Sequence, residues 1–390
     1  MGIGGGLKLL CIFSALDMRH DFGCTSSWWQ FSKGLYELGH EVIAVPYFGG
    51  AIESPWWRAY PNPCQYEGQA FSYAKRMIGS GASATEGGIV PRINKLLIDS
   101  WIRPRWNTHL SRILERERDV DAVIFFSVPL GHLQGLPARL QQRYDVPFFY
   151  FDGDVPVSLP RFGGFASGFR VYDGADLAEY EGFMCNSMAG ANELTELGAK
   201  RVATVYWGTD PDLYAPVTHD QDRDVFFYGL GAEYREEWIQ SMLVDPKFAM
   251  PEASFAVGGS GFGDLLGPVP CQGSVSTGAL RRECARSRIN LNIAREAHAS
   301  VYASATTRLF ELAAMGSCIV SNPAEGMGEW FDEGDHVLTV QNSEQAIAAY
   351  TELLGDAPRR RAMGNAARQR IIDRHTHRHR AADIVKFVSP

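Results

Sequence analysis

The sequence predicts an α/β protein with two doubly wound domains that face each other across a cleft. The first observation is the length, because 390 residues exceed the roughly 250–300 at which a single hydrophobic core stops growing. The second is that short apolar runs, typical of buried parallel strands, alternate along the chain with segments of helical periodicity. The third is an aperiodic segment at 209–217 with two prolines, which is the expected linker.

Composition and charge exclude several other classes. Hydrophobic residues make up 45% and charged residues 21%, which excludes a disordered chain, a collagen and a coiled coil. The net charge of -8 argues against a general nucleic-acid binder. The seven cysteines are odd in number and form no CxxC pair, which favours reduced thiols and a cytoplasmic location. No stretch approaches the ~20 apolar residues that a transmembrane helix needs.

The first domain is expected over 1–215 and opens with a β-loop-α-β unit. Residues 7–13 are a continuous apolar run, typical of a buried parallel strand. A helix follows, with Ser or Thr at 25–27 to cap its start and Gly39 to close its end. Residues 40–46 form the next strand, so this unit has the connection of a doubly wound sheet.

The alternation resumes after an insertion. Residues 50–100 hold prolines, tryptophans and a Gly/Ser-rich stretch, which indicates a long loop or insertion with a helix near 92–116. The later elements expected in this domain are strands 121–128, 146–151 and 182–187, helix 189–198 and strand 202–208.

The second domain is expected over 216–375 and again alternates. Its predicted strands are 224–228, 253–257, 288–293, 317–321 and 336–340, and its predicted helices are 233–243, 278–287 and 307–316. From about residue 343 the chain is expected to be helical to its end.

The strongest chemical signal is Thr306-Thr307-Arg308 at the start of a predicted helix, with Glu311 three residues later. A helix N-terminus with threonine hydroxyls and unpaired backbone N–H groups can bind an anion, and Arg308 can add a bidentate contact to phosphate. Glu311 lies on the same helix face, and its carboxylate can accept hydrogen bonds from two ribose hydroxyls. The set fits a nucleoside diphosphate. The alternative is a surface Arg–Glu pair, which the position between two apolar strands disfavours.

The segment 307–345 (TRLFELAAMGSCIVSNPAEGMGEWFDEGDHVLTVQNSEQ) resembles the C-terminal signature of group-1 glycosyltransferases with the GT-B fold. It is especially similar to the branch related to the spore-maturation protein CgeB. Blocks at 186–216, 225–239, 285–295 and 374–387 resemble other parts of that family, so the resemblance covers about 180–390.

The resemblance implies two Rossmann-like domains, the first for the acceptor and the second for the sugar donor. It also implies that a final helix, 376–390, crosses back to the first domain. The expected reaction moves a sugar from a nucleoside diphosphate sugar (UDP, GDP or dTDP type) to an acceptor, with retention of configuration. No metal and no other cofactor is expected.

Donor-site residues follow from the same resemblance. Glu311 matches the ribose-binding glutamate, and Thr306, Thr307 and Arg308 match the diphosphate-binding turn. One position departs from the pattern: many relatives have a second Glu eight residues earlier, where this chain has Ala303, so the donor need not be a common hexose. Further donor-binding candidates are Arg295, Arg235, Ser274, Val275 and Gly23.

Polar residues that follow the strands of the first domain are its candidates, because ligands of open α/β sheets bind beyond the carboxyl ends of the strands. The catalytic candidates are His132, Asp17 and Asp152. The acceptor-binding candidates are Asp154, His20, Asp21, Trp56 and Trp57. Each of these residues also has a purely structural alternative. Asp152 and Asp154 could simply form a turn, and His132 could be an ordinary loop histidine. Trp56 and Trp57 could pack as the core of the insertion.

Three other functions stay open at this point. A nucleotide-sugar 2-epimerase can share the layout but releases no nucleoside diphosphate on addition of an acceptor. A non-catalytic carbohydrate- or coat-associated relative would not bind nucleotide through Glu311. Transfer to a base in DNA is disfavoured by the acidic charge, although the C-terminal segment is rich in arginine.

Overall fold

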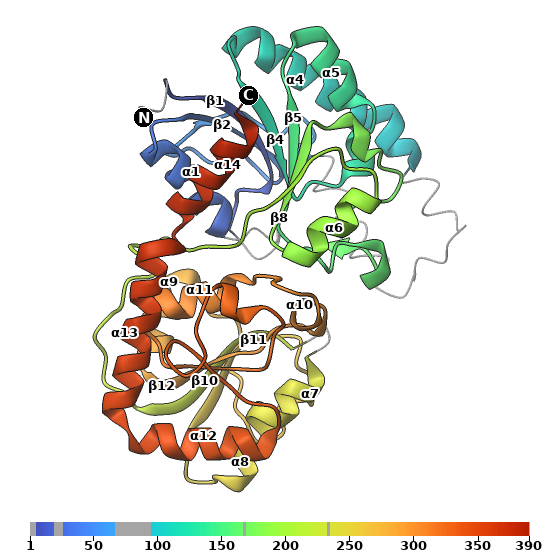
Figure 1. The fold of residues 1–390 in the computed structure, drawn as a ribbon. Coiled ribbons are helices and arrows are strands. Elements are labelled where there is room, and N and C mark those ends of the chain that lie inside the picture. Colours follow the sequence, from blue (N-terminus) through green and yellow to red (C-terminus); the bar gives the residue numbers. More distant parts are fainter. Residues whose placement is uncertain (1–4, 19–25, 67–94, 167–168, 232–234, 390) are drawn as a thin grey trace. The chain divides into compact units, whose positions relative to one another are not determined.

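The computed structural model describes residues 5–18, 26–66, 95–166, 169–231 and 235–389. The chain divides into two compact units (Figure 1). Unit 1 comprises Met1–Asn186, Gly190–Val205 and Ala381–Pro390, and unit 2 comprises Ser187–Ala189 and Tyr206–Arg380. The chain therefore enters unit 2 about ten residues earlier than the predicted boundary at 215, because the aperiodic segment packs within unit 2.

Unit 1 is built, in the described residues, on a parallel seven-stranded sheet of order β3-β2-β1-β4-β5-β8-β9. Its central strands β1, β4 and β5 are mostly apolar and buried because both faces of the sheet are covered. The strands are β1 (Lys8–Ala15), β2 (Glu41–Phe48), β3 (Arg58–Ala59), β4 (Ala122–Phe126), β5 (Phe148–Asp152), β8 (Gly182–Cys185) and β9 (Val202–Thr204), and a separate hairpin joins β6 (Phe165–Ala166) to β7 (Phe169–Arg170).

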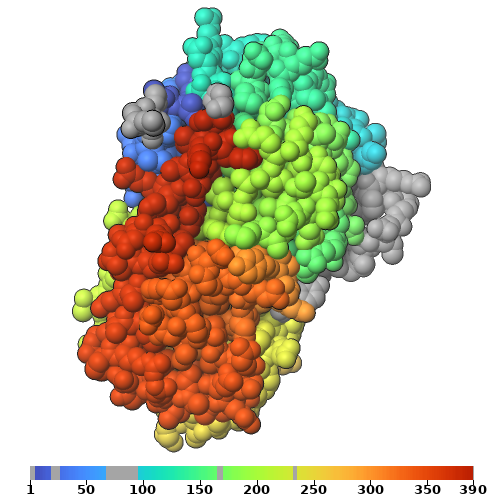
Figure 2. Space-filling model, in the orientation of Figure 1, coloured from blue at the N-terminus to red at the C-terminus, as the bar shows by residue number. Residues whose placement is uncertain are grey.

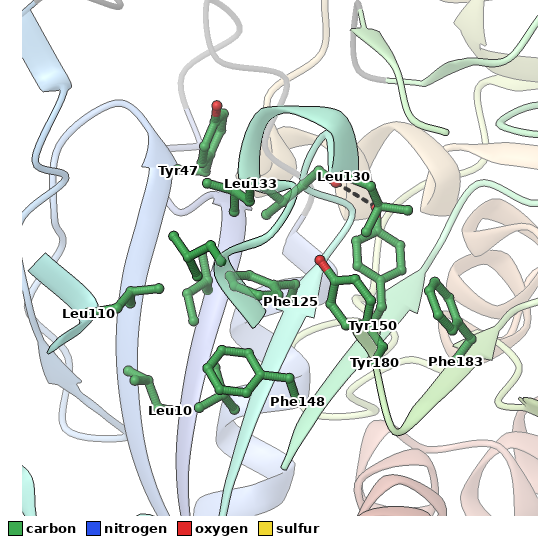
Figure 3. Close-up of a cluster of buried hydrophobic side chains, with 14 of the residues drawn as sticks. Leu10, Tyr47, Leu110, Phe125, Leu130, Leu133, Phe148, Tyr150, Tyr180 and Phe183 are labelled. Atoms are coloured by element: carbon green, nitrogen blue, oxygen red, sulfur yellow. Dashed lines mark hydrogen bonds between the residues drawn. The ribbon is translucent and has the colours of Figure 1, made fainter. Parts of the chain in front are cut away.

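Helices cover both faces of this sheet (Figure 1). On one face, α4 (Arg103–Glu117) and α5 (Leu136–Tyr144) pack on the cluster that Figure 3 shows around Phe125 and Tyr150. On the other face, α1 (Ser26–Glu37) buries Trp28 and Phe31 against aromatic rings of β4 and β5. The helix predicted near 92–116 is present as a π-helical turn at Ile98–Ile102 that runs into α4, whereas α5 was not predicted.

Unit 2 holds, in the described residues, a parallel five-stranded sheet of order β11-β10-β12-β13-β14. Its strands are β10 (Arg223–Leu230), β11 (Phe255–Ser260), β12 (Ser287–Asn292), β13 (Ile319–Ser321) and β14 (Leu338–Thr339). Its helices are α7 (Glu236–Ile239), α8 (Asp245–Ala249), α9 (Thr277–Ala285), α10 (Glu296–Ser300), α11 (Thr307–Ala314), α12 (Ser343–Gly355) and α13 (Ala357–Arg374), with a π-helical turn at Gln240–Val244 and α6 (Met188–Glu196) shared between the units.

The last helix, α14 (His377–Val388), begins in unit 2 and ends in unit 1. Within unit 1, the Phe387 ring packs edge-on to Phe149 with centroids 5.8 Å apart, and Arg201 donates to the Phe387 carbonyl at 2.9 Å. Figure 2 shows this helix (red) against the light green segment near residue 200. Gly182 leaves room for the ring, since a Cβ there would lie 2.7 Å from it.

None of the described helices is both long and apolar enough to cross a lipid bilayer.

Candidate functional site

The carboxyl edge of the unit 2 sheet is shaped by two glycines, each the last but one residue of its strand. Gly229 in β10 lies beside Arg308, and a Cβ on it would lie 2.5 Å from the Arg308 guanidinium. Gly259 in β11 has a φ of +140°, and a Cβ on it would overlap the Gly229 carbonyl oxygen. Only a residue without a side chain lets these two backbones approach so closely. The absence of a side chain at Gly229 leaves space at the carboxyl edge of the sheet for the Arg308 guanidinium.

Two guanidinium groups converge on one backbone oxygen at this edge. Arg308, in the first turn of α11, donates from Nη1 to the Ile293 carbonyl at 2.9 Å. Arg235 is buried and donates from Nε to the same oxygen at 3.1 Å, and from Nη1 to the Leu230 carbonyl at 3.0 Å. Ile293 directly follows β12, so both cations are held at the carboxyl ends of β10 and β12.

Arg295 extends this positive cluster. It is the N-cap residue of α10, and it lies near the buried His298. Burial lowers the pKa of His298 well below its usual value, and the positive charges of Arg295 and Arg235 lower the pKa further. The imidazole is therefore neutral at neutral pH, so the cluster carries three guanidinium charges in a small volume. An anion such as a diphosphate would be strongly attracted to that volume.

Glu311 lies one turn along α11 from the cluster. It is half-buried, and each of its carboxylate oxygens accepts a hydrogen bond from a tyrosine. Tyr214 donates to Oε1 at 2.9 Å and Tyr228 donates to Oε2 at 2.8 Å. The Arg308 guanidinium lies over the Tyr228 ring, 5.3 Å from its centroid. The predicted phosphate-binding and ribose-binding side chains are thus brought together at one sheet edge.

The other predicted donor-site residues lie around this edge. Thr306 is the N-cap of α11, where its side chain makes no capping hydrogen bond, and Thr307 begins the helix. The segment before Ser274 and Val275 runs along β11, where Gly259 donates to the Gly273 carbonyl at 2.7 Å. Ser274 is exposed and Val275 is half-buried. Gly23 lies outside the described residues.

Ala303, which stands where relatives have a second glutamate, cannot carry a sugar-binding side chain in this fold. It is fully buried and has a φ of +52°, a conformation that side-chain-bearing residues rarely adopt. Its amide donates to the Glu325 carbonyl at 2.8 Å. Contacts to the sugar must therefore come from other positions.

In unit 1, the catalytic role predicted for His132 is disfavoured. The His132 Nδ1 atom lies 2.6 Å from the Tyr47 hydroxyl. Burial, together with the charge of the nearby Arg103, lowers the pKa of His132 to about 4. Burial raises the pKa of Tyr47, so the phenol keeps its proton. A ring with a pKa far below neutral pH is a weak base, which makes His132 a poor general base.

Asp152, also predicted as catalytic, is fully buried at the end of β5. Its Oδ2 accepts from the hydroxyls of Ser158 and Tyr172, and its Oδ1 accepts from the Asp154 amide at 2.9 Å. Burial raises the pKa of Asp152. The carboxyl thus holds its own loop together and has no surface through which to touch a substrate.

The remaining first-domain candidates differ in exposure. Asp17 is largely buried just after β1, and Asp154 is half-buried just after β5, so both lie at the carboxyl edge of the sheet. Trp57 is buried: its Nε1 donates to the Ile52 carbonyl at 2.8 Å, and its ring packs edge-on to Trp29. The packed-core alternative therefore holds for Trp57. His20 and Asp21 lie outside the described residues.

Trp56 is half-buried and also meets the Trp29 ring edge-on, with centroids 6.4 Å apart. The Lys33 ammonium lies 5.9 Å from its centroid. Trp56 is thus an outer member of the same tryptophan cluster, and its acceptor contact stays a prediction.

Tyr214 and Tyr228 are the residues that sequence reasoning missed. Tyr228 lies near the end of an apolar strand before a glycine turn, a position that could have marked it as facing a ligand. Tyr214 lies in the aperiodic segment, where no periodicity indicates which way a side chain points.

Residues 235–386 match the model of a family described as glycosyl transferase-like. This match includes Arg235, Arg295, Arg308 and Glu311. No curated protein matches the sequence significantly.

Solved structures match nearly the whole chain. Sucrose-phosphate synthase from Thermosynechococcus elongatus has a TM-score of 0.63 at 14% identity, over 97% of this chain and 98% of that one. Anabaena HepE in complex with UDP and glucose has a TM-score of 0.60 at 12% identity, over 98% and 99%. T4 phage BGT in complex with UDP-glucose has a TM-score of 0.57 at 10% identity, over 98% and 100%. The predicted GT-B fold is confirmed by these structures, and residues 235–386 resemble a glycosyl transferase-like family, whereas the CgeB-related branch stays a prediction.

Proposed function

We propose that this GT-B-fold protein is a glycosyltransferase that binds the nucleoside diphosphate of its sugar donor at the carboxyl edge of the unit 2 sheet and transfers the sugar to an acceptor. The observation that carries the proposal is the convergence of Arg308 and Arg235 on the Ile293 carbonyl, one helical turn from Glu311. The guanidinium groups would hold the diphosphate, and the carboxylate would accept hydrogen bonds from the ribose.

The same charges would assist the chemistry. When the bond between the sugar and the diphosphate breaks, negative charge grows on the leaving diphosphate. Arg308, Arg235 and Arg295 would stabilise that charge without having to reorganise, because backbone carbonyls and buried surroundings already hold the first two. No metal is invoked. Retention of configuration and the use of unit 1 for the acceptor remain proposals that rest on the family resemblance.

The donor site is tested by calorimetric titration of UDP, GDP and dTDP. Arg308→Ala removes a charged phosphate ligand, so we expect affinity for the bound nucleotide to fall about 10- to 100-fold. Arg286→Ala is the matched control: Arg286 pairs with Asp222 at 2.8 Å and precedes β12, at the opposite edge of the same sheet. Equal affinities of the wild type and the Arg308 variant would contradict the proposed site.

Catalysis is tested by mass spectrometry of the products from a panel of nucleoside diphosphate sugars and acceptors. A transferase releases free nucleoside diphosphate in proportion to glycosylated acceptor. The 2-epimerase alternative would instead change the donor sugar with no acceptor present, and that result would overturn transfer as the function.

We also propose a cytoplasmic location. Cys11, Cys271, Cys284 and Cys318 are thiols that form no disulfide, which suits a reducing compartment.

A further inference from the structure

The carboxylate of Glu311 is held from both sides by groups distant in sequence. Tyr214 precedes β10 by several residues and is 97 residues away, and Tyr228 lies within β10, 83 residues away. Tyr214 is only 2% exposed, so its phenol has no competing bulk water. Tyr228 is half-buried. Two tyrosine hydroxyls that converge on one side chain fix both its position and the plane of its carboxylate.

These hydroxyls also oppose the effect of burial on Glu311. Burial raises the pKa of Glu311, whereas the hydrogen bonds from Tyr228 and Tyr214 and the charge of Arg308 lower it. The thiol of Cys284 on α9 also faces this carboxylate, and burial raises the pKa of that thiol so that it stays neutral. Among the described residues these are the groups that face Glu311, and burial outweighs the donors, so that its pKa lies above the ordinary value for a glutamate. An ionised carboxylate can only accept hydrogen bonds.

We propose that Tyr214 and Tyr228 are positioning residues that hold Glu311 for a pair of adjacent hydroxyls, so that the site prefers ribonucleoside over 2′-deoxyribonucleoside diphosphates. A carboxylate offers about four acceptor positions, and the phenols occupy one on each oxygen. One acceptor position on each oxygen therefore remains for the ligand, which matches the 2′- and 3′-hydroxyls of a ribose. A 2′-deoxyribose has only the 3′-hydroxyl and leaves one of these acceptor positions without a donor.

This inference rests on the proposed nucleotide site, and it narrows the donor to a UDP or GDP type. A dTDP sugar has a 2′-deoxyribose and would leave one oxygen of a partly buried carboxylate without its second donor. Losing a hydrogen bond to a charged group in such surroundings is costly.

The test is calorimetric titration of two matched pairs, UDP with 2′-deoxy-UDP and GDP with 2′-deoxy-GDP. In whichever pair the wild type binds, we expect the ribonucleotide to bind at least about tenfold more tightly than its 2′-deoxy counterpart. In Tyr228→Phe and in Tyr214→Phe we expect this ratio to fall at least about threefold, because the carboxylate is free to turn. Tyr350→Phe is the matched control: it removes a buried hydroxyl that donates to the Met242 carbonyl at 2.8 Å in the same unit but away from the site.

A second readout is the pH dependence of ribonucleotide binding. Binding requires ionised Glu311, so it is lost as the pH falls through the pKa of that group. Loss of a phenol donor raises this pKa, so we expect binding by Tyr228→Phe to fail at a higher pH than binding by the wild type. A merely structural role would lower the melting temperature and leave both the ratio and the pH midpoint unchanged, which would overturn the inference alone. A wild type that binds none of the four nucleotides would overturn the proposed site itself.

Discussion

The carboxylates of Asp152 and Glu311 both accept hydrogen bonds from hydroxyl groups but differ in their exposure to solvent. Asp152 accepts from Ser158 and Tyr172 through one oxygen and is completely enclosed. Glu311 accepts one tyrosine hydroxyl on each oxygen and is only half-buried at the edge of a sheet. Hydroxyl donors stabilise a carboxylate in both places, and exposure decides which one can meet a ligand.

Asp152→Asn tests the structural role of the enclosed carboxyl. The amide keeps the shape but weakens the hydrogen bonds from the two hydroxyls, so we expect the free energy of unfolding to fall by about 1–3 kcal/mol. Urea denaturation measures this change. We expect nucleotide affinity to stay at the wild-type value, because the residue belongs to unit 1. A variant as stable as the wild type but unable to transfer sugar would show instead that Asp152 takes part in the chemistry.

At the scale of the elements, the ends of β10 and β11 decide whether the donor site can form. Gly229 and Gly259 allow the two strand ends to touch, and this contact leaves room for the Arg308 guanidinium beside Gly229. Helix α11 then starts at the same edge and presents Arg308 and Glu311 together.

Gly259→Ala should separate these strand ends. The new Cβ overlaps the Gly229 carbonyl, which is backbone and cannot swing aside, so we expect lower stability and at least tenfold weaker nucleotide binding. Gly278→Ala is the control, since its Cβ meets nothing within 4 Å and it lies in α9, where alanine is the better helix former. Thermal unfolding and nucleotide titration compare the two. Normal binding by a folded Gly259 variant would contradict the importance of this contact.

Prediction of the elements succeeded where the signal was local. Most strands of both sheets are near-continuous apolar runs and were placed to within a few residues. The exception is β3, a two-residue strand in the segment 50–100 that was predicted to be a loop or insertion. The short helices α5 and α10 were missed, because five to nine residues give too little periodicity to stand out from a loop. The segment taken as a linker also hid Tyr214, whose role depends on packing within unit 2.

At the scale of the whole molecule, burial of imidazoles links stability to pH. Burial is the main cause that lowers the pKa of six described histidines: His40, His109, His132, His298, His375 and His377. The folded state therefore binds fewer protons than the unfolded state at mildly acidic pH. Stability must rise with pH in that range.

We expect the free energy of unfolding to fall as the pH drops below the unfolded-state value of about 6.5. The loss continues toward the folded-state pKa values, which are about 4 for His132 and about 3 for His375. Each proton taken up on unfolding contributes up to about 1.4 kcal/mol per pH unit. Urea denaturation at pH 7.5, 6.5 and 5.5 measures the slope.

His132→Gln provides the internal check on this slope. It removes one buried titrating group, so we expect a smaller slope than in the wild type, whereas the exposed His219→Gln should leave the slope unchanged. A flat stability profile between pH 7.5 and 5.5 would contradict the proposed contribution of the buried histidines.

The sequence by itself determined the two-domain α/β alternation and the turn that carries Arg308 and Glu311, and the resemblance of 307–345 to a known family implied the GT-B class. The alternation follows from local periodicity and the turn from a short motif, which a chain displays without being folded. Only the tertiary structure decided that Glu311 lies between two tyrosines, that Asp152 is fully buried and that His132 is neutral. Those properties depend on burial and on partners distant in sequence, and both exist only once the sheets have formed.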